Sequence, residues 1–351
     1  MTNNPVRVLV AGLGNMGYSH ALAYHEHPDY QIAGLVTRSG KVPDKLAGYP
    51  SHTDYHAALA GTKPDLVSIN TYTDTHAEYA IAAMQAGAHV FVEKPLATSV
   101  ADARAVVDTA RALGRKLVVG YILRHHPSWI DFIKRARAFG GPYVMRLNLN
   151  QQSAGKSWQV HKRLMESTSP MVDCGVHYID VMCQITDARP VQVRGMGVRL
   201  TDEIDPAQMN YTHLQVIFED GSVGWYEAGW GPMMSETAFF VKDVITPRGA
   251  ISIVMDDTAK SDDMDTHTRT ARVRVHHATL GADGAFVRKD EWYSNADEPG
   301  HDALCAREQD FMLRAIRQDI DLTKHNEDAV RSLEIVLASD ISTREMRAVD
   351  L

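Results

Sequence analysis

The sequence has few cysteines, no long apolar run and no long block of basic residues. Its three cysteines show no CxxC spacing, which argues against a disulfide framework or structural zinc and fits a reducing compartment. No apolar run approaches the roughly 20 residues that span a bilayer, and the N-terminus lacks the basic and apolar segments of a signal peptide. The formal charge of -8 disfavours nucleic acid as a partner. These absences predict a cytoplasmic protein that contacts neither membranes nor nucleic acid.

The composition is that of an ordinary soluble globular protein. Hydrophobic residues make up 44% of the 351 residues and charged residues 23%. A chain of this length is long for one core, so we expect two domains.

A glycine-rich turn near the N-terminus predicts a dinucleotide-binding site. The β-rich run 6–11 leads directly into this turn, and a helix is expected over 18–27. Strand, GxGxxG and helix in this order form the context that the fingerprint requires. The glycines permit a tight turn, close approach of the pyrophosphate and close helix–strand packing. The residues of the turn, all predicted to bind the cofactor, are Gly12, Leu13, Gly14, Asn15, Met16 and Gly17.

The end of the second predicted strand, 31–36, determines the choice of cofactor. An Asp or Glu at this point would bind the ribose hydroxyls of NAD, but the sequence has Thr37, Arg38 and Ser39. Without a carboxylate there is no repulsion against a 2′-phosphate, and Arg38 can pair with that phosphate. The sequence therefore predicts NADP in preference to NAD.

Strands and helices alternate through the first third of the chain, which predicts a doubly wound parallel sheet. The strand 89–92 is apolar enough to be central, so its carboxyl end should deliver Glu93 and Lys94 to the ligand-binding edge of the sheet. Pro95 then ends the strand. A cis peptide bond between Lys94 and Pro95 would fix the direction in which Lys94 points. The other elements expected here are strands over 65–70 and 116–120 and helices over 76–86 and 99–113.

The rest of the chain predicts an α+β domain with a large, mostly antiparallel sheet that has one open face. Residues 143–150 alternate between apolar and polar, and a hairpin is expected over 211–228 around Asp220-Gly221. Further strands are expected over 237–244, 250–255 and 271–277, and helices over 127–139, 301–317 and 326–347. We place the domains at 1–123 and 124–351. Acidic residues between 256 and 265 suggest a solvated hairpin tip, with a cation site as the alternative.

Two segments of this second domain carry candidate substrate residues. Residues 151–169 are expected to be irregular, with Trp158 placed to stack on a sugar ring and His161 to bind hydroxyls; a solvated loop is the alternative. Ser169 and Pro170 predict the start of a helix over 171–185, in which Asp173, His177, Asp180 and Gln184 form one stripe. Gly175 inside that helix predicts close packing. His125 and His126 are adjacent and point apart, so no metal site is expected.

The sequence resembles the glucose–fructose oxidoreductase / inositol dehydrogenase / MocA family over essentially its whole length. The resemblance rests on the GxGxxG start, the segment Thr71-Tyr72-Thr73-Asp74-Thr75-His76, Glu93-Lys94-Pro95 and Asp173-Cys174-Gly175-Val176-His177. It implies an NAD(P)-dependent oxidoreductase that transfers a hydride between the nicotinamide and a secondary hydroxyl or ketone of a sugar, inositol or related polyol. It also implies a homodimer or homotetramer formed through the C-terminal sheet.

The resemblance implies roles for individual residues. Lys94 would contact the reacting hydroxyl and the nicotinamide ribose, with Glu93 near the ribose, and Lys94, Asp173 and His177 would be catalytic. His177 suits a general base at neutral pH, with Lys94 as the alternative base. Arg124 would contact cofactor or substrate. Further cofactor contacts are expected at Asn70, Thr71, Tyr72 and His76.

Three rival functions remain open at this point. Some relatives use a bound NAD transiently to cleave glycosidic bonds, so a redox-neutral glycosidase is one alternative. A regulator that binds the cofactor without catalysis is another, although such proteins usually lose the lysine or histidine that this chain keeps. A role like that of biliverdin reductase is disfavoured because the Asp173–His177 pair suits a polyol.

Overall fold

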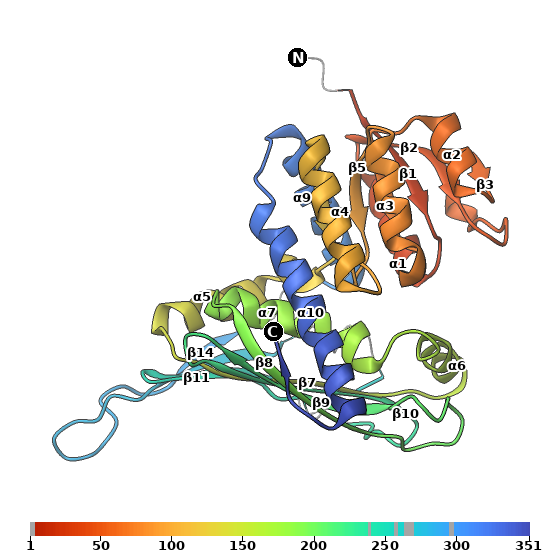
Figure 1. Cartoon of the computed structure of the whole chain (residues 1–351). Coiled ribbons are helices and arrows are strands. Elements are labelled where there is room, and N and C mark those ends of the chain that lie inside the picture. Colours follow the sequence, from red (N-terminus) through yellow and green to blue (C-terminus); the bar gives the residue numbers. More distant parts are fainter. Residues whose placement is uncertain (1–3, 238–239, 256–258, 263–269, 295–297) are drawn as a thin grey trace. The chain divides into compact units, whose positions relative to one another are not determined.

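The computed structural model describes residues 4–237, 240–255, 259–262, 270–294 and 298–351 (Figure 1). The chain divides into two compact units. The first contains residues 1–122 and 301–330, and the second contains residues 123–300 and 331–351. The C-terminal part of the chain thus contributes to both units. The acidic segment between 256 and 265 lies largely outside the described residues.

The first unit is a doubly wound parallel sheet in the order β3-β2-β1-β4-β5-β6. In this order the direction of the strand connections reverses between β1 and β4. Dinucleotide-binding folds bind their ligand at such a switch point. The strands are β1 (Val6–Ala11), β2 (Tyr30–Val36), β3 (Ser51–His52), β4 (Leu66–Ile69), β5 (His89–Val92) and β6 (Leu117–Val119). The helices are α1 (Asn15–Glu26), α2 (Tyr55–Thr62), α3 (His76–Gln85), α4 (Val100–Leu113) and α9 (His301–Arg317).

The core of the first unit joins the two ends of the sequence. Strands β4 and β5 are buried along nearly their whole length, which explains their continuous apolar runs. Helix α1 packs against α9, and α3 packs against α4. Met312 and Leu313 of α9 belong to the same buried cluster as Val8 and Phe91. The helix ends follow their local sequence signals: Ser99 caps α4, and Gly114 ends it with a positive φ.

The second unit contains a nine-stranded mixed sheet with helices on one face (Figure 1). Its order is β14-β13-β12-β11-β7-β10-β9-β8-β15, and β7 and β10 pair in parallel whereas the other pairs are antiparallel. The strands are β7 (Val144–Gln152), β8 (Pro190–Val198), β9 (Tyr211–Phe218), β10 (Val223–Gly231), β11 (Lys242–Thr246), β12 (Gly249–Val254), β13 (Arg272–His277), β14 (Glu291–Ser294) and β15 (Val349–Asp350). The helices are α5 (Pro127–Phe139), α6 (Gly155–Leu164) and α7 (Pro170–Thr186).

Helix α10 (Thr323–Glu345) contains the boundary between the two units. Alternation along the sheet directs Tyr226 and Trp230 to the helix-covered face, where Tyr178 of α7 stacks on Tyr226 with ring centroids 5.0 Å apart. No helix of the described part of the chain is long and apolar enough to cross a membrane. The predicted fold class is confirmed in both units.

One prediction about the second unit is wrong. Residues 151–169 were expected to be irregular, but 155–164 form helix α6. Trp158, His161 and Met165 are buried at spacings of three and four residues, so the segment has an apolar face despite its polar composition. The burial of this face favours the helix.

Candidate active site

The glycine-rich turn between β1 and α1 has the geometry that a dinucleotide requires. Gly12 has a φ of +92°, and a Cβ there would lie 2.4 Å from the Asn70 carbonyl oxygen. A Cβ on Gly17 would lie 2.1 Å from the Gly12 carbonyl oxygen, so neither position accepts a side chain. A Cβ on Gly14 would meet nothing within 4 Å, and Gly14 is the N-cap of α1. The turn is therefore tightly packed on the protein side and open at Gly14, where a pyrophosphate would approach the helix N-terminus.

The residues after β2 are accessible, as a ribose-binding loop must be. Arg38 and Ser39 are exposed, and the hydroxyls of Thr37 and Ser39 lie 3.2 Å apart. Among the described residues, no hydrogen bond or ion pair holds the Arg38 guanidinium. It is thus free to meet a phosphate.

The side chain of His76 connects the loops that follow β4 and β5. Its Nδ1 lies 2.8 Å from the Pro95 carbonyl oxygen and its Nε2 lies 3.1 Å from the Thr71 carbonyl oxygen. Burial lowers the pKa of His76, so the neutral ring donates to one of the two carbonyls. Asn70 is buried and bonds to Ser68, whereas Tyr72 is 48% exposed. Among these residues, Tyr72 has the most accessible side chain.

At the end of β5, Glu93 is buried and Lys94 is partly buried. One carboxylate oxygen of Glu93 lies 2.8 Å from His20 Nε2, and the other accepts the Lys94 backbone N–H at 3.1 Å. The Lys94–Pro95 peptide bond is cis, as predicted. Glu93 is therefore tied to the protein through both oxygens.

Helix α7 in the second unit presents two polar side chains from an otherwise buried helix segment. Between Pro170 and Cys183, Asp173 and His177 alone are partly exposed, and they lie one turn apart. Ser169 caps the helix by accepting the Val172 N–H at 3.1 Å. A Cβ on Gly175 would lie 3.2 Å from side-chain atoms of Tyr226 and Val336, which explains the glycine. The glycine lets α7 pack closely enough to hold Asp173 and His177 rigidly.

Two family descriptions match the chain, one over each part. "Oxidoreductase family, NAD-binding Rossmann fold" matches residues 6–121, and "GFO/IDH/MocA C-terminal domain" matches residues 133–241. The chain belongs to the Gfo/Idh/MocA family. This confirms the resemblance that the sequence motifs indicated.

Curated and solved relatives agree with this family. A UDP-N-acetylglucosamine 3-dehydrogenase of Acidithiobacillus ferrooxidans is 31% identical over 209 residues, which are 58% of this chain and 61% of that protein. A scyllo-inositol 2-dehydrogenase (NAD(+)) of Bacillus subtilis is 27% identical over 234 residues, covering 64% of this chain and 67% of that protein. The solved UDP-N-acetylglucosamine 3-dehydrogenase of A. ferrooxidans has a TM-score of 0.75 at 23% identity, covering 97% and 98% of the two chains. The structural likeness supports the fold.

Other candidates in this Gfo/Idh/MocA protein lie in more enclosed positions. The Arg124 guanidinium donates to both carboxylate oxygens of the buried Asp180, at 2.8 and 2.6 Å, and this pairing fixes its orientation. Trp158 is buried, with its indole N–H 3.3 Å from Glu203, and His161 stacks on Trp230 at 4.3 Å. A contact of Trp158 or His161 with substrate stays a prediction.

Sequence reasoning missed the residues behind Glu93, namely His20 of α1 and Gln309 of α9. Gln309 Nε2 lies 2.9 Å from His20 Nδ1. His20, Ala21 and Tyr24 form the buried face of α1, so a histidine on an apolar face was the available signal for one partner. No local pattern could indicate Gln309.

Proposed function

We propose that the protein is an NAD(P)-dependent dehydrogenase of a secondary hydroxyl in a sugar, inositol or related polyol. The observation that carries the proposal is the pair Asp173 and His177, which α7 leaves partly exposed while it buries their neighbours. A rigidly held imidazole beside a carboxylate suits removal of a hydroxyl proton. The matched segment spans about 61% of the first curated relative, so the activity is inferred from the site and the family together.

The first unit fits a dinucleotide at Gly12, Gly14 and Gly17. The open space at Gly14 and the tight packing at the other two glycines form a cradle for a pyrophosphate. When bound, the nicotinamide supplies the hydride acceptor. Glu93, Asn70, Thr71, Tyr72 and His76 would line its ribose side, with Leu13, Asn15 and Met16 along the turn and Arg124 as a further contact.

For the adenosine end we propose NADP in preference to NAD. Arg38 is exposed at the end of β2, and no carboxylate occupies the three positions Thr37, Arg38 and Ser39. A guanidinium pairs with a 2′-phosphate through two parallel hydrogen bonds, whereas a carboxylate would repel it.

The chain's own residues then handle the proton and the substrate oxygen. His177 would accept the hydroxyl proton, and Asp173 would orient the imidazole or the substrate. Lys94 would bind the same oxygen and stabilise the negative charge that develops on it. Trp158 and His161 would contribute to the sugar-binding surface. Lys94 is the alternative proton acceptor if its ammonium is desolvated by the substrate.

A substrate and cofactor screen tests this function. The purified protein is mixed with sugars, nucleotide sugars and inositols, and NADH or NADPH formation is followed at 340 nm. We expect turnover of at least one polyol, with a higher kcat/KM for NADP than for NAD. A kcat/KM tenfold higher with NAD would overturn the cofactor choice. Cleavage of a glycoside without net NAD(P)H would identify the glycosidase alternative, and cofactor binding without any turnover would identify the regulator.

We further propose that the open face of the second sheet forms a homodimer or homotetramer. Val144, Ile217, Val223 and Ile245 are each about two-fifths exposed. The pairing registers place them side by side across β9, β10, β7 and β11. A continuous apolar row on a sheet without covering helices suits self-association. Light scattering of the eluting protein should give two or four times the 38.9 kDa chain mass; a monomer mass contradicts it.

The cytoplasm is the compartment we propose for this activity. Cys174, Cys183 and Cys305 are buried free thiols, which suits a reducing environment. Cell fractionation with an antibody against the protein tests the location, and recovery with the exported fraction would contradict it.

A further inference from the structure

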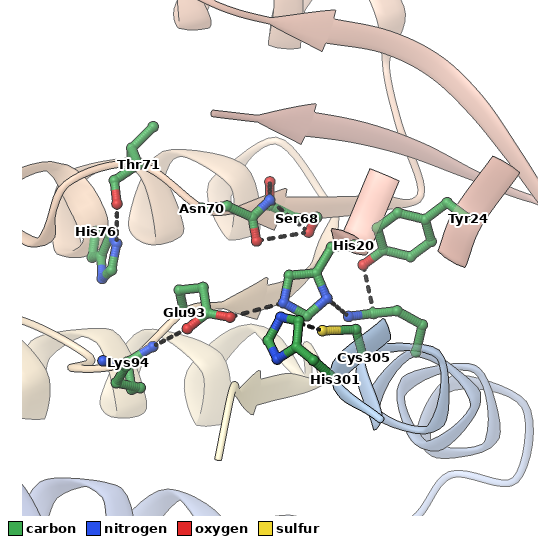
Figure 2. A network of polar contacts seen from close by, with 11 residues as sticks. His20, Tyr24, Ser68, Asn70, Thr71, His76, Glu93, Lys94, His301 and Cys305 are labelled. Atoms are coloured by element: carbon green, nitrogen blue, oxygen red, sulfur yellow. Dashed lines mark hydrogen bonds and ion pairs between the residues drawn. The ribbon is translucent and has the colours of Figure 1, made fainter. Parts of the chain in front are cut away.

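A chain of hydrogen bonds inside the first unit leads from α9 to the end of β5 (Figure 2). The Tyr24 hydroxyl donates to Gln309 Oε1 at 2.5 Å, and Gln309 Nε2 lies 2.9 Å from His20 Nδ1. His20 Nε2 lies 2.8 Å from Glu93 Oε1. The other oxygen of Glu93 accepts the Lys94 backbone N–H at 3.1 Å. The chain joins residues 289 positions apart in the sequence.

The partners in this chain determine which nitrogen of His20 carries the proton. The Gln309 carbonyl oxygen accepts from Tyr24, so its amide nitrogen is the group that faces His20 and donates to Nδ1. Nδ1 therefore accepts, and Nε2 carries the hydrogen that is donated to Glu93. The His20 ring is fully buried and lies against Phe91, with centroids 4.7 Å apart. Packing and hydrogen bonds thus allow one tautomer and one ring orientation.

Two further groups on α9 lie beside this chain. Ligand atoms of His20, Cys305 and Glu308 lie within 4.8 Å of one another, a spacing that a metal ion could use. Both nitrogens of His20 are already engaged, however. Burial raises the pKa of Cys305, and burial together with the charge of Glu93 raises that of Glu308. Because both His20 nitrogens are in hydrogen bonds, His20 favours its place in the chain over metal coordination.

We propose that His20 and Gln309 are positioning residues that hold the Glu93–Lys94 segment for hydride transfer. The inference rests on the proposed function and names how Lys94 is oriented. His20 holds one oxygen of Glu93, and the other oxygen accepts from the Lys94 backbone amide, so the chain of bonds links α9 to the Lys94 backbone. The groups that face Glu93 include His20 from α1, Cys305 and Glu308 from α9, His76 from α3 and Lys94 itself.

Paired substitutions of His20 separate this positioning from general stability. His20→Leu removes the His20 hydrogen bond to Glu93 and the acceptor of the Gln309 amide, whereas His20→Gln keeps an amide N–H for Glu93. We expect His20→Leu to lower kcat by about 10- to 100-fold through displacement of the Lys94 segment, and His20→Gln to recover most of that loss. Glu308→Gln is the matched control, because it changes a neighbouring buried acid without breaking the chain, and it should leave kcat unchanged.

A second measurement needs no catalytic activity. In ¹⁵N-histidine-labelled protein, long-range ¹H–¹⁵N spectra at pH 8 should show His20 with its hydrogen on Nε2, assigned by the signal lost in His20→Gln. Gln309→Leu removes the donor to Nδ1 and should produce a mixture of tautomers, and it serves as the test if His20→Leu does not fold. This readout stays valid if no polyol is oxidised, so failure of the network and failure of the proposed function are distinguishable.

Three results would overturn the proposal. One is a His20 hydrogen on Nδ1 in the native protein. Another is a kcat for His20→Gln as low as that for His20→Leu, which would indicate that packing alone is at work. The third is one equivalent of zinc or iron in metal analysis of the purified protein, if both Cys305→Ser and Glu308→Gln lose it. That result would show that His20 is a metal ligand.

Discussion

Carboxyl groups at the two ends of helix α7, Asp180 of α7 itself and Asp340 of α10, have different hydrogen-bond partners. Near its C-terminal end, the buried Asp180 accepts two hydrogen bonds from Arg124 and one from Gln184. Near its N-terminal end, Asp340 accepts from the Ser169 hydroxyl at 2.9–3.0 Å. Burial raises the pKa of Asp340 to about 6, although Ser169 and Arg344 oppose the shift. A bidentate guanidinium stabilises a buried carboxylate, whereas a hydroxyl and a more distant charge do not suffice.

The segment between these ends carries the candidate catalytic pair. Asp173 and His177 belong to the same stripe as Asp180 and Gln184, and Asp180 is the one member of the four that is buried. Helical spacing places the four side chains on one side of α7. The contacts of each side chain determine whether it can act on a ligand.

The largest expected effect is on catalysis at His177. Replacement by alanine removes the proposed general base and should lower kcat by about 10²- to 10⁴-fold. The melting temperature should change little, because the side chain is partly exposed. Steady-state kinetics and thermal unfolding measure the two quantities. Gln184→Ala, at the other end of the stripe, is the control and should retain its kcat. Near-native kcat in His177→Ala would transfer the role of base to Lys94.

The next largest effect is on stability at the Arg124 end. Arg124→Met leaves Asp180 as a buried carboxylate without its cation and should lower the free energy of unfolding by about 3–5 kcal/mol. Urea titration measures this change. The double variant Arg124→Met/Asp180→Leu should recover most of it, since both charges are then absent.

Arg199→Met provides the comparison for an exposed ion pair. Its partner Asp202 is 98% exposed, so the loss should stay below about 1 kcal/mol. An equal loss in Arg124→Met and Arg199→Met would refute the special role of the buried pair.

A pH dependence of stability, no larger than the loss at the Arg124 end, is expected at the Asp340 end. Its pKa is higher in the folded protein, about 6, than the ordinary value of 3.8. The folded state therefore holds the proton more tightly, and stability that is present below pH 4 is lost as the pH rises through 6. Asp340→Asn keeps an acceptor for Ser169 without charge. Its unfolding free energy should equal that of the native protein at pH 4 and exceed it by at most about 3 kcal/mol at pH 8. A constant difference between pH 4 and pH 8 would contradict this.

The first unit could be predicted well from local patterns, because its strands are apolar and its glycines have specific roles. The strand 89–92 was predicted with the bounds that β5 has. Strand β3 and helix α2 were missed because a two-residue strand and a weakly amphipathic helix carry little signal. Strand β8 was missed for a different reason. A Cβ on its Gly195 would lie 2.2 Å from the Ser339 carbonyl oxygen, so this close approach requires glycine, and glycine weakens a strand pattern.

The site was predictable to the extent that its residues follow local rules. Asp173 and His177 share a helical face, and Gly14 follows a strand, so local patterns together with the family motifs indicated them. The pairs Arg124–Asp180 and His20–Gln309 join segments that are far apart in the sequence. No repeating pattern of residue types indicates such a contact. The parallel pairing of β7 with β10 was unpredictable for the same reason, because hairpin signals describe only neighbouring strands.

The contribution of α9 to the first core has a consequence for biosynthesis. A ribosome releases residues 1–122 long before residues 301–330, yet both ranges form the first unit. Until α9 emerges, the cluster that contains Val8, Phe91 and Met312 lacks part of its apolar lining. The core of the first unit therefore stays incompletely packed until nearly the whole chain has been translated. Premature termination before residue 301 would damage the beginning of the protein as much as its end.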